Sequence, residues 1–397
     1  YGSEQLLSFQ ANGATGALPP TQRGVSGQSL TLPGQGALSR AGYEFGGWNT
    51  AADGSGPAYA AGASFLLGSA DAVLYAAWKP KLEFDLNGAG GSAPASLYQF
   101  TEQSLNLPGQ GAMIRNGYQF DGWSAESGGG GASYAEGAAY TFGAAPALLY
   151  ARWKPGVGFD ANGGTGSPPS ALYNYQGLNV TTPSGAGLSR IGYKFGGWNS
   201  LANGTGTNYP AGAAYTMGAS PSTLYAKWDE LVVGDPGPAG GVVFYKKADY
   251  TGGWRYLEAW TADEPGDYKW GSYNVLLGST GTAIGTGYAN TYTALNAPAV
   301  VTADYPAAAA ARAANHGGYA DWFLPSKDEL TALGNERARL LPFPGLYYWS
   351  SSEFSATEAV MFQITAGISV SWEWEKDNGL VAFGTVYPSY VRVIRRF

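Results

Sequence analysis

A spacing of 75 residues, found three times in succession, constrains the fold of this 397-residue chain more than any other feature. Two strings recur in this frame, Gly-Tyr-x-Phe-x-Gly-Trp and Leu-Tyr-Ala-x-Trp, and they end at Trp48, Trp123 and Trp198 and at Trp78, Trp153 and Trp228. A fixed period of this kind is typical of tandem structural units. We therefore predict three repeats without insertions, over residues 5–79, 80–154 and 155–229.

Each predicted repeat contains short apolar–polar alternations bounded by turns, which indicate β-strands. In the second repeat such stretches cover residues 82–86, 104–107, 118–120 and 149–153. Four short strands form a small sheet that needs cover on one face, and we expect a helical turn near residues 39–42 and its copies to supply it. The recurring tryptophans are interpreted as core aromatics, with a sugar-stacking surface as the alternative.

The three units resemble the Listeria–Bacteroides repeat, the B-repeat type of internalins. The resemblance rests on the Gly-Tyr-x-Phe-x-Gly-Trp string, on Tyr59 and its copies in a Gly-rich loop, and on the closing Leu-Tyr-Ala-x-Trp. It implies a compact, β-grasp-like fold and a stalk or spacer role on a bacterial surface, with weak adhesive roles in some members.

Composition and charge exclude several classes of function. The net charge is −7, and residues 1–230 carry 10 basic and 13 acidic side chains without a basic stripe, so we expect no nucleic-acid partner. The absence of cysteine excludes thiol nucleophiles, thiolate zinc sites and iron–sulfur clusters. No stretch of about 18 apolar residues is present, so we expect no membrane span. Attachment through a lipid anchor outside this sequence stays open. We expect no cofactor and no metal.

The repeat frame stops near Glu230, and the Gly- and Pro-rich stretch 230–238 predicts a linker to a domain over residues 239–397. A hairpin is expected from 240–245 and 254–260. A helix over 307–314 is expected to be capped by Asp304, and a second helix to begin at a capping box formed by Ser326 and Glu329.

The last 50 residues are predicted to be strands, beginning at Tyr347. Asp377-Asn378-Gly379 indicates a hairpin turn, with 380–386 as the return strand and 390–394 as the final strand.

Four segments of this domain, 284–291, 318–330, 348–353 and 391–395, resemble in combination the C-terminal domain of the Legionella collagen-like adhesin, also called the Fibrobacter succinogenes major paralogous type. Such domains are similar to C-type-lectin-like variable proteins that retroelements diversify. The resemblance implies an α+β, C-type-lectin-like fold whose ligand-contacting segment is 354–390. This chain departs from the pattern at Val360, where the family often has Trp, and in a longer stretch after Lys376.

The expected fold class is therefore multidomain, with three small β-grasp-like repeats and an α+β C-terminal domain. Strand periodicity predicts that the even-numbered residues of 368–374 face the core and that Met361 points outward. Outward aromatic and Met side chains rimmed by polar ones favour a contact surface; the alternative is that Trp372 and Trp374 are simply core. The predicted ligand-binding residues are Phe354, Thr357, Met361, Gln363, Thr365, Ser369, Ser371, Trp372, Glu373, Trp374, Asp377, Asn378, Phe383 and Tyr387.

These patterns predict an extracellular, bacterial surface-displayed binding protein whose partner is a protein or glycan on another surface. Two alternatives stay open, a structural spacer without a ligand and a calcium-independent carbohydrate-binding protein. No enzyme is expected, because His316 is the only histidine and has no visible orienting partner. Asp321 is interpreted as structural, and Glu264-Pro265-Gly266 lacks the amide of a calcium–sugar motif.

Overall fold

The computed structural model describes residues 3–296, 304–340, 342–365, 368–377, 380–382 and 385–397. The chain divides into two compact units. The first unit contains Tyr1–Asp160, Pro169–Ser184 and Asn199–Tyr225, and the second contains Ala161–Pro168, Gly185–Trp198 and Ala226–Phe397. The first two repeats therefore lie wholly in the first unit, whereas residues of the third repeat belong to both.

The first repeat is built from strands β1 (Glu4–Gln10), β2 (Gln22–Val25), β3 (Ser29–Thr31), β4 (Tyr43–Asn49), β5 (Ala58–Tyr59), β6 (Ser64–Leu66) and β7 (Ala72–Asp85). β1 pairs in parallel with β7 and antiparallel with β2, and β4 pairs with the other edge of β7. The expected helical turn near residues 39–42 is wrong, because that stretch is a turn bridged to Thr15. The small β3–β6 pair covers the sheet instead, with Leu30 and Phe65 against its core.

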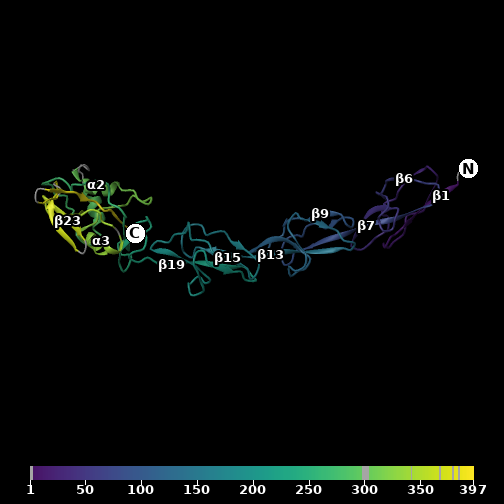
Figure 1. Cartoon of the computed structure of the whole chain (residues 1–397), viewed down its shortest axis with the longest axis horizontal. Coiled ribbons are helices and arrows are strands. Elements are labelled where there is room, and N and C mark those ends of the chain that lie inside the picture. The colour runs from purple at the N-terminus through teal and green to yellow at the C-terminus, as the bar shows by residue number, and fades with distance from the viewer. Residues whose placement is uncertain (1–2, 297–303, 341, 366–367, 378–379, 383–384) are drawn as a thin grey trace. The chain divides into compact units, whose positions relative to one another are not determined.

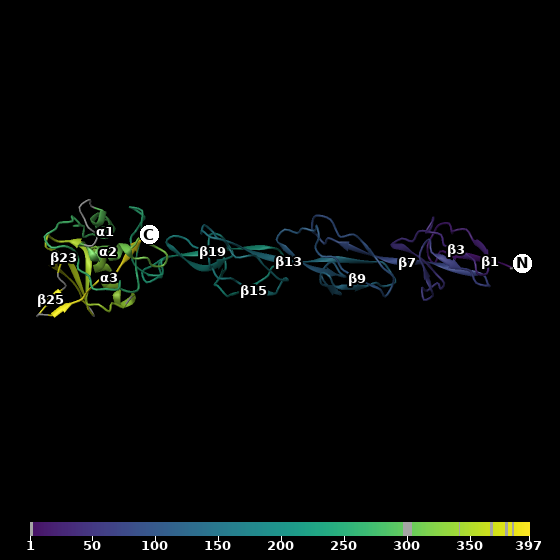
Figure 2. The same cartoon turned by 90° about the horizontal axis from the view of Figure 1, so that it is seen from above.

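Two long strands join the repeats without a linker (Figures 1 and 2). The second repeat runs from β7 through β8 (Leu97–Tyr98), β9 (Ser104–Asn106), β10 (Tyr118–Ser124), β11 (Ser133–Tyr134) and β12 (Ala139–Thr141) to β13 (Ala147–Asp160). The third runs on through β14 (Leu172–Tyr173), β15 (Asn179–Thr181), β16 (Tyr193–Asn199), β17 (Asn208–Tyr209), β18 (Ala214–Thr216) and β19 (Ser222–Glu230).

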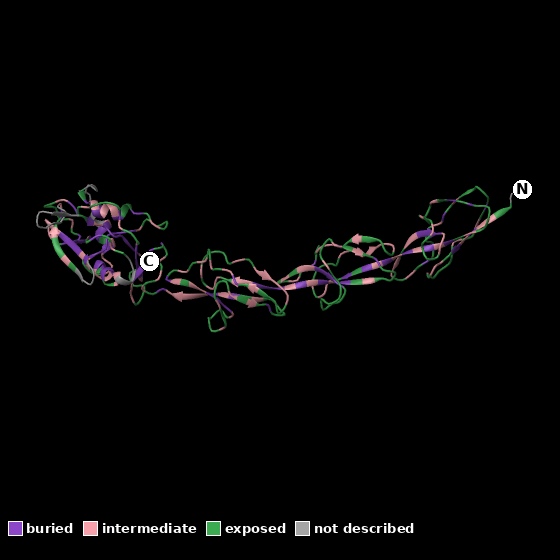
Figure 3. Ribbon diagram, in the orientation of Figure 1, coloured by how far each residue is buried: buried purple, intermediate pink, exposed green. Residues whose placement is uncertain are grey.

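β7 and β13 have 14 residues each, so the first half of each strand closes one repeat and the second half opens the next. The second half of β7 pairs in parallel with the first half of β13, with Leu82 opposite Ala147 and Asp85 opposite Tyr150. Alternate residues of β7 are buried along its length (Figure 3). Because side chains alternate without interruption along β7, the same face of this strand points to the core in both repeats that share it.

The recurring tryptophans Trp48, Trp123 and Trp198 are completely buried, which confirms that they are core residues. Trp123 lies 4.6 Å from the ring of Phe84, and its indole N–H donates to the Pro108 carbonyl at 2.7 Å. Trp48 makes the corresponding contacts in the first repeat. Each repeat therefore folds around its own aromatic core.

The second unit adds three helices and nine strands over its described residues. The helices are α1 (Gly287–Asn296), α2 (Pro306–Ala313) and α3 (Lys327–Leu340). The strands are β20 (Val242–Lys246), β21 (Tyr256–Ala259), β22 (Tyr347–Glu353), β23 (Glu358–Thr365), β24 (Ile368–Glu375), β25 (Leu380–Ala382), β26 (Thr385–Tyr387), β27 (Ser389–Tyr390) and β28 (Ile394–Arg396). One sheet has the order β20-β21-β28 and another the order β24-β23-β22-β27.

Two apolar clusters hold this arrangement together, and in both views the helices lie beside β23 (Figures 1 and 2). The α2 core contains Ala307, Ala311, Trp349 and Met361 among its buried residues. The α3 core joins Leu330 and Leu333 to residues that include Tyr348, Val360, Phe362 and Ile364. The β22–β23 part of the four-stranded sheet is therefore covered on both faces.

The structure confirms the predicted β20–β21 hairpin and the capping box at α3. Ser326 N–H donates to the Glu329 carboxylate at 2.7 Å, and Glu329 N–H donates to Ser326 Oγ at 3.3 Å. The predicted Asp304 cap is wrong, because α2 begins at Pro306 with Tyr305 as its N-cap and no side-chain cap. Helix α1 was not predicted.

The predicted return strand over 380–386 is also wrong, because β25 and β26 pair with each other. Residues 378–379 of the predicted Asp377-Asn378-Gly379 turn lie outside the described residues. The linker over 230–238 stays a prediction, and its segment makes backbone hydrogen bonds with β20. Gly234 N–H donates to the Val243 carbonyl and Val243 N–H donates to the Asp235 carbonyl, each at 2.9 Å. The neighbouring Leu231 is buried beside Val243, so this segment is fastened to β20.

Candidate ligand-binding surface

Several predicted binding residues lie on β24, which is the edge strand of the four-stranded sheet in the described part of the chain. In the pairing of β23 with its neighbours, Met361 stands opposite Trp349 of β22 and Trp372 of β24, so the three share one face. Met361 is 1% exposed. The predicted outward orientation of Met361 is wrong, because β23 is an inner strand and both of its faces are covered.

Trp372 is 50% exposed and Val370 is 37% exposed, so the even-numbered face of β24 is only partly core. Trp374 is half-buried and lies against the α2 core. The prediction that this whole face is buried is therefore wrong, since the core ends at Trp374. On the opposite face Ser371 is half-buried and Glu373 is exposed.

The loop between β22 and β23 presents Phe354, whose side chain is 60% exposed. This loop is closed by hydrogen bonds from Phe354 N–H and Ser355 N–H to the Glu358 carbonyl, at 3.1 and 3.0 Å. The Thr357 carbonyl accepts from Lys376 N–H at 3.0 Å, which joins the loop to the end of β24. Phe354 and Thr357 thus lie at the end of the sheet where β24 finishes.

A fully buried ion pair anchors this end of the sheet. Lys376 Nζ lies 2.5 Å from the Glu353 carboxylate, and both side chains have no exposed surface. Lys376 also donates to the Val275 carbonyl at 2.6 Å, while Glu353 accepts from two backbone N–H groups, of Leu277 and Gly278. Because every charge is paired and hydrogen-bonded, the pair fixes the ends of β22 and β24 against each other. This ion pair was not predicted. Two sequence features point to it: Lys376 directly follows an alternating strand, and a polar run ends at Glu353.

The remaining predicted residues divide into two groups. Gln363 is half-buried and donates to Tyr347 Oη at 3.4 Å. Asp377 is half-buried, and its Oδ1 accepts no hydrogen bond from the described part of the chain. The side chains of the other members lie outside the described residues: Thr365, Ser369, Asn378, Phe383 and Tyr387.

Buried arginines tie the terminal strand to the rest of the unit. Arg392 lies 2.5 Å from Asp263, which also accepts a hydrogen bond from Tyr348 Oη at 2.9 Å. Burial raises the pKa of the Tyr348 hydroxyl. Arg395 lies 2.9 Å from Asp321. This contact supports the interpretation of Asp321 as a structural residue.

His316 has a partner that the sequence did not reveal. Its Nε2 lies 2.6 Å from the Glu264 carboxylate, and its ring stacks on Trp260 with centroids 4.5 Å apart. The indole covers one face of the imidazole, so the arrangement holds the ring in place. Among the described residues, no three His, Asp or Glu side chains form a metal-binding group.

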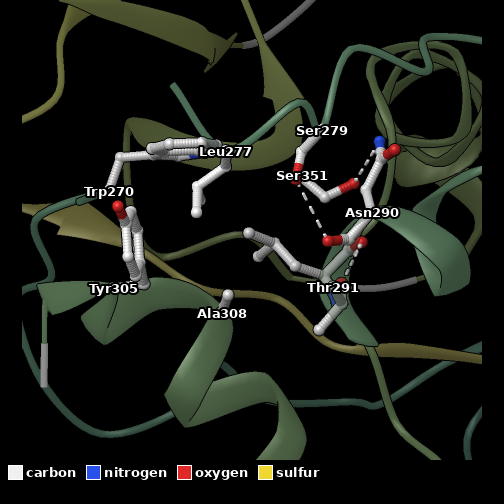
Figure 4. Close-up of a pocket in the computed structure, with 9 residues that line it drawn as sticks. Trp270, Leu277, Ser279, Asn290, Thr291, Tyr305, Ala308 and Ser351 are labelled. Carbon is white, nitrogen blue, oxygen red and sulfur yellow. Dashed lines mark hydrogen bonds between the residues drawn. The ribbon is translucent and has the colours of Figure 1, made fainter. Parts of the chain in front are cut away.

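An internal cavity of about 10 Å³ lies between Trp270, Tyr305, α1 and the Ser351 segment (Figure 4). Its polar wall is connected by hydrogen bonds from Asn290 Nδ2 to Ser351 Oγ and from Ser279 Oγ to the Asn290 carbonyl, both at 3.2 Å. This volume is enough for about one water molecule. This cavity is therefore too small for a ligand larger than water.

A family model described as the Listeria-Bacteroides repeat domain matches residues 6–77, 81–152 and 156–227, which make up more than half of the chain. This match confirms the three predicted repeats. A Gly-rich protein of Evansella cellulosilytica, named as a membrane protein, is 35% identical over 204 residues, covering 48% of this chain and 23% of the relative.

A second protein of that organism, also named as a membrane protein, is 30% identical over 171 residues, or 40% of this chain and 24% of its own length. The chain thus spans about a quarter of the length of these curated relatives. A fimbrial protein of known structure from Bacteroides ovatus aligns with 84% of this chain and 74% of its own, with a TM-score of 0.30 and 10% identity. No helix in the described part of the chain is long and apolar enough to cross a bilayer.

Proposed function

Because the chain belongs to the Listeria–Bacteroides repeat domain family, we propose that it is a non-enzymatic, surface-displayed bacterial adhesin or receptor in which the repeats form a stalk for a C-terminal binding module. The continuous strands β7 and β13 support the stalk role, because they join successive repeats through backbone pairing.

The observation that carries the binding role is the exposure of Trp372 and Phe354 at an edge of the sheet held by the buried Lys376–Glu353 pair. Large aromatic side chains on a rigid support give contact area at a low cost in conformational entropy, and they are enriched at binding hot spots. The half-buried Gln363 lies on the same face of the sheet as Trp372, and the half-buried Asp377 follows the end of β24, so both supply polar groups there. We propose a protein or glycan on another surface as the partner.

Two finer assignments belong to the same proposal. We propose a C-type-lectin-like fold for residues 239–397 and a β-grasp-like fold for each repeat. We also propose that segment 354–390 is the part that a retroelement diversifies. Sequencing this gene from related isolates tests the last point, since substitutions confined to 354–390 support it and an even distribution contradicts it.

The binding proposal is tested by screening the full chain against arrays of glycans and cell-surface proteins. Trp372→Ala and Phe354→Ala are each expected to weaken binding of a captured ligand at least tenfold, with an unchanged melting temperature, because both side chains are exposed. The matched control is Leu66→Ala, which removes an exposed leucine, 67% accessible, from β6 of the first repeat.

Binding that survives both aromatic substitutions would contradict the assignment of the site. A chain that binds nothing in either array would favour the alternative of a structural spacer without a specific ligand.

A further inference from the structure

The junction between the first and second repeats contains a groove of about 570 Å³, and the junction between the second and third contains one of about 430 Å³. Both lie within the first unit. Eleven of their lining positions correspond in the 75-residue frame, including Asn12 and Asn87, Arg40 and Arg115, Tyr43 and Tyr118, Trp78 and Trp153, Phe100 and Tyr175, and Ala144 and Ala219. The grooves are therefore two copies of one surface feature.

Each groove is built by residues of two successive repeats. Tyr43 Oη donates to the Ala144 carbonyl at 2.9 Å, and Tyr118 Oη donates to the Ala219 carbonyl at 3.5 Å. The arginine that precedes each tyrosine lies over its ring, with the guanidinium carbon 3.9 Å from the centroid for Arg40 and 4.0 Å for Arg115. Stacking on the ring holds the planar guanidinium in a fixed orientation.

These arginines are incompletely paired. Arg40 and Arg115 each donate one hydrogen bond to a backbone carbonyl, of Asn12 at 3.5 Å and of Asn87 at 3.3 Å. Within the described ranges neither arginine has a carboxylate partner. The second groove also contains Arg152, whose Nε makes no hydrogen bond to the described residues, and Asp121 lies 3.7 Å from Arg152. In the first groove the acidic residue Asp53 already accepts hydrogen bonds from Ser55.

A third copy of the arginine–tyrosine pair lies in the second unit. Arg190 is 4.4 Å from the ring centroid of Tyr193, and both line a groove of about 710 Å³ together with Trp228, Tyr250 and Arg395. Tyr250, which lies beyond the third repeat, adds an aromatic side chain to this groove. Among the residues that the structure describes, no acidic side chain lines this third groove.

We propose that these grooves bind a linear polysaccharide that carries carboxylate groups. Aromatic rings such as Phe100 and Tyr175 offer flat apolar faces for sugar rings. A guanidinium with free N–H groups matches a carboxylate in a bidentate geometry. Residues 1–230 have a net charge of −3 and contribute one recurring groove arginine for each repeat, so they lack the basic stripe that a nucleic-acid backbone needs. A repeating polymer can also occupy successive grooves, which raises its avidity.

The test uses the full chain in affinity gel electrophoresis with polygalacturonate, a linear polymer of uronic acid. Its methyl ester is the matched neutral probe, because it keeps the sugar rings and removes the charge. We expect polygalacturonate to retard the chain at least tenfold more strongly than the ester does, and added salt to weaken the retardation.

The variant Arg40→Ala/Arg115→Ala/Arg190→Ala is expected to lose at least tenfold in affinity for polygalacturonate. The control is Arg23→Ala, because Arg23 is a 68% exposed arginine that lies 3.9 Å from Glu4 and lines none of the three grooves. If the alanine variant fails to fold, the triple Arg→Lys variant keeps the charge but loses the planar fork, and it should bind at least threefold more weakly than the parent chain.

Trp372→Ala separates this proposal from the proposed function, because it should leave polygalacturonate binding unchanged. Equal retardation by polygalacturonate and its ester, retardation by neither, or equal affinities of the triple variants and Arg23→Ala would each overturn the proposal.

Discussion

The substitution Trp123→Ala tests whether the shared strands couple the repeats energetically. Trp123 is completely buried, and replacing a buried tryptophan by alanine costs about 3–5 kcal/mol through lost burial and the remaining cavity. Its N–H bond to the Pro108 carbonyl, at 2.7 Å, adds about 1 kcal/mol. We therefore expect the second repeat to lose about 4–6 kcal/mol. Trp123→Phe keeps most of the apolar area and should cost about half as much.

The loss should reach the first repeat, because the second half of β7 pairs with β13. When the second repeat unfolds, residues 82–85 lose their partner strand, although they are continuous with the strand that closes the first repeat. Stability in such arrays depends on the interface between neighbouring repeats as well as on each repeat. Trp48→Ala should remove the same contacts from the first repeat.

Hydrogen exchange of the full chain, read amide by amide, measures these losses separately for each strand. In Trp123→Ala, protection should fall most in β10 and β13 and by a smaller amount in β7, whereas the control Leu66→Ala should leave all three unchanged. Unchanged protection in β10 would refute the reasoning about the core. A loss in β10 and β13 that leaves β7 at its original protection would refute the coupling through the shared strand.

Three further predictions concern single contacts. Lys376→Met should destabilise the second unit by about 3–5 kcal/mol in thermal melts, because it leaves Glu353 buried without its partner, and adding Glu353→Met should restore most of the loss. Gly42→Ala should lower the free energy of unfolding in urea more than Gly36→Ala does. Both glycines have positive φ angles, +77° and +59°, so both substitutions strain the backbone. Only at Gly42 would the new methyl group also meet a proline of the next repeat, at 2.7 Å. Burial alone would raise the pKa of Asp121, but hydrogen bonds from a lysine and a tyrosine lower this pKa overall. The stabilising contribution of the ionised Asp121 is therefore complete above the ordinary pKa of an aspartate, and it is lost as the pH falls through the lower pKa of the folded state. Stability measured from pH 5 down to pH 3 should therefore fall less steeply in Asp121→Asn than in the parent chain.

The repeats could be predicted from the sequence because their signal is local and occurs three times. The alternation that identifies a strand also identifies its inward face, and a tryptophan fixed in that frame three times is most simply a core residue. The helical turn was predicted wrongly because the sequence indicates that a face needs cover but not which segment provides it; here the β3–β6 pair does so.

The candidate surface was predicted less well because the exposure of a strand depends on its place in the sheet. Met361 and Trp372 show the same alternation, yet the first is on an inner strand and the second is on the edge strand. The order of strands is a tertiary property that periodicity does not contain. Buried ion pairs such as Lys376–Glu353 are equally hidden, since each charge alone is typical of an exposed position.

The parallel pairing within each repeat determines how the chain responds to tension. In the first repeat the chain enters through β1 and leaves through β7, and these strands run side by side in the same direction. A pull on the two ends therefore slides one strand along the other and loads the hydrogen bonds between residues 7–10 and 72–75 together. The same geometry recurs where β7 enters and β13 leaves the second repeat. Each repeat thus resists stretching by shear, and a force that would open a terminal hairpin one bond at a time must here break a whole row of bonds at once.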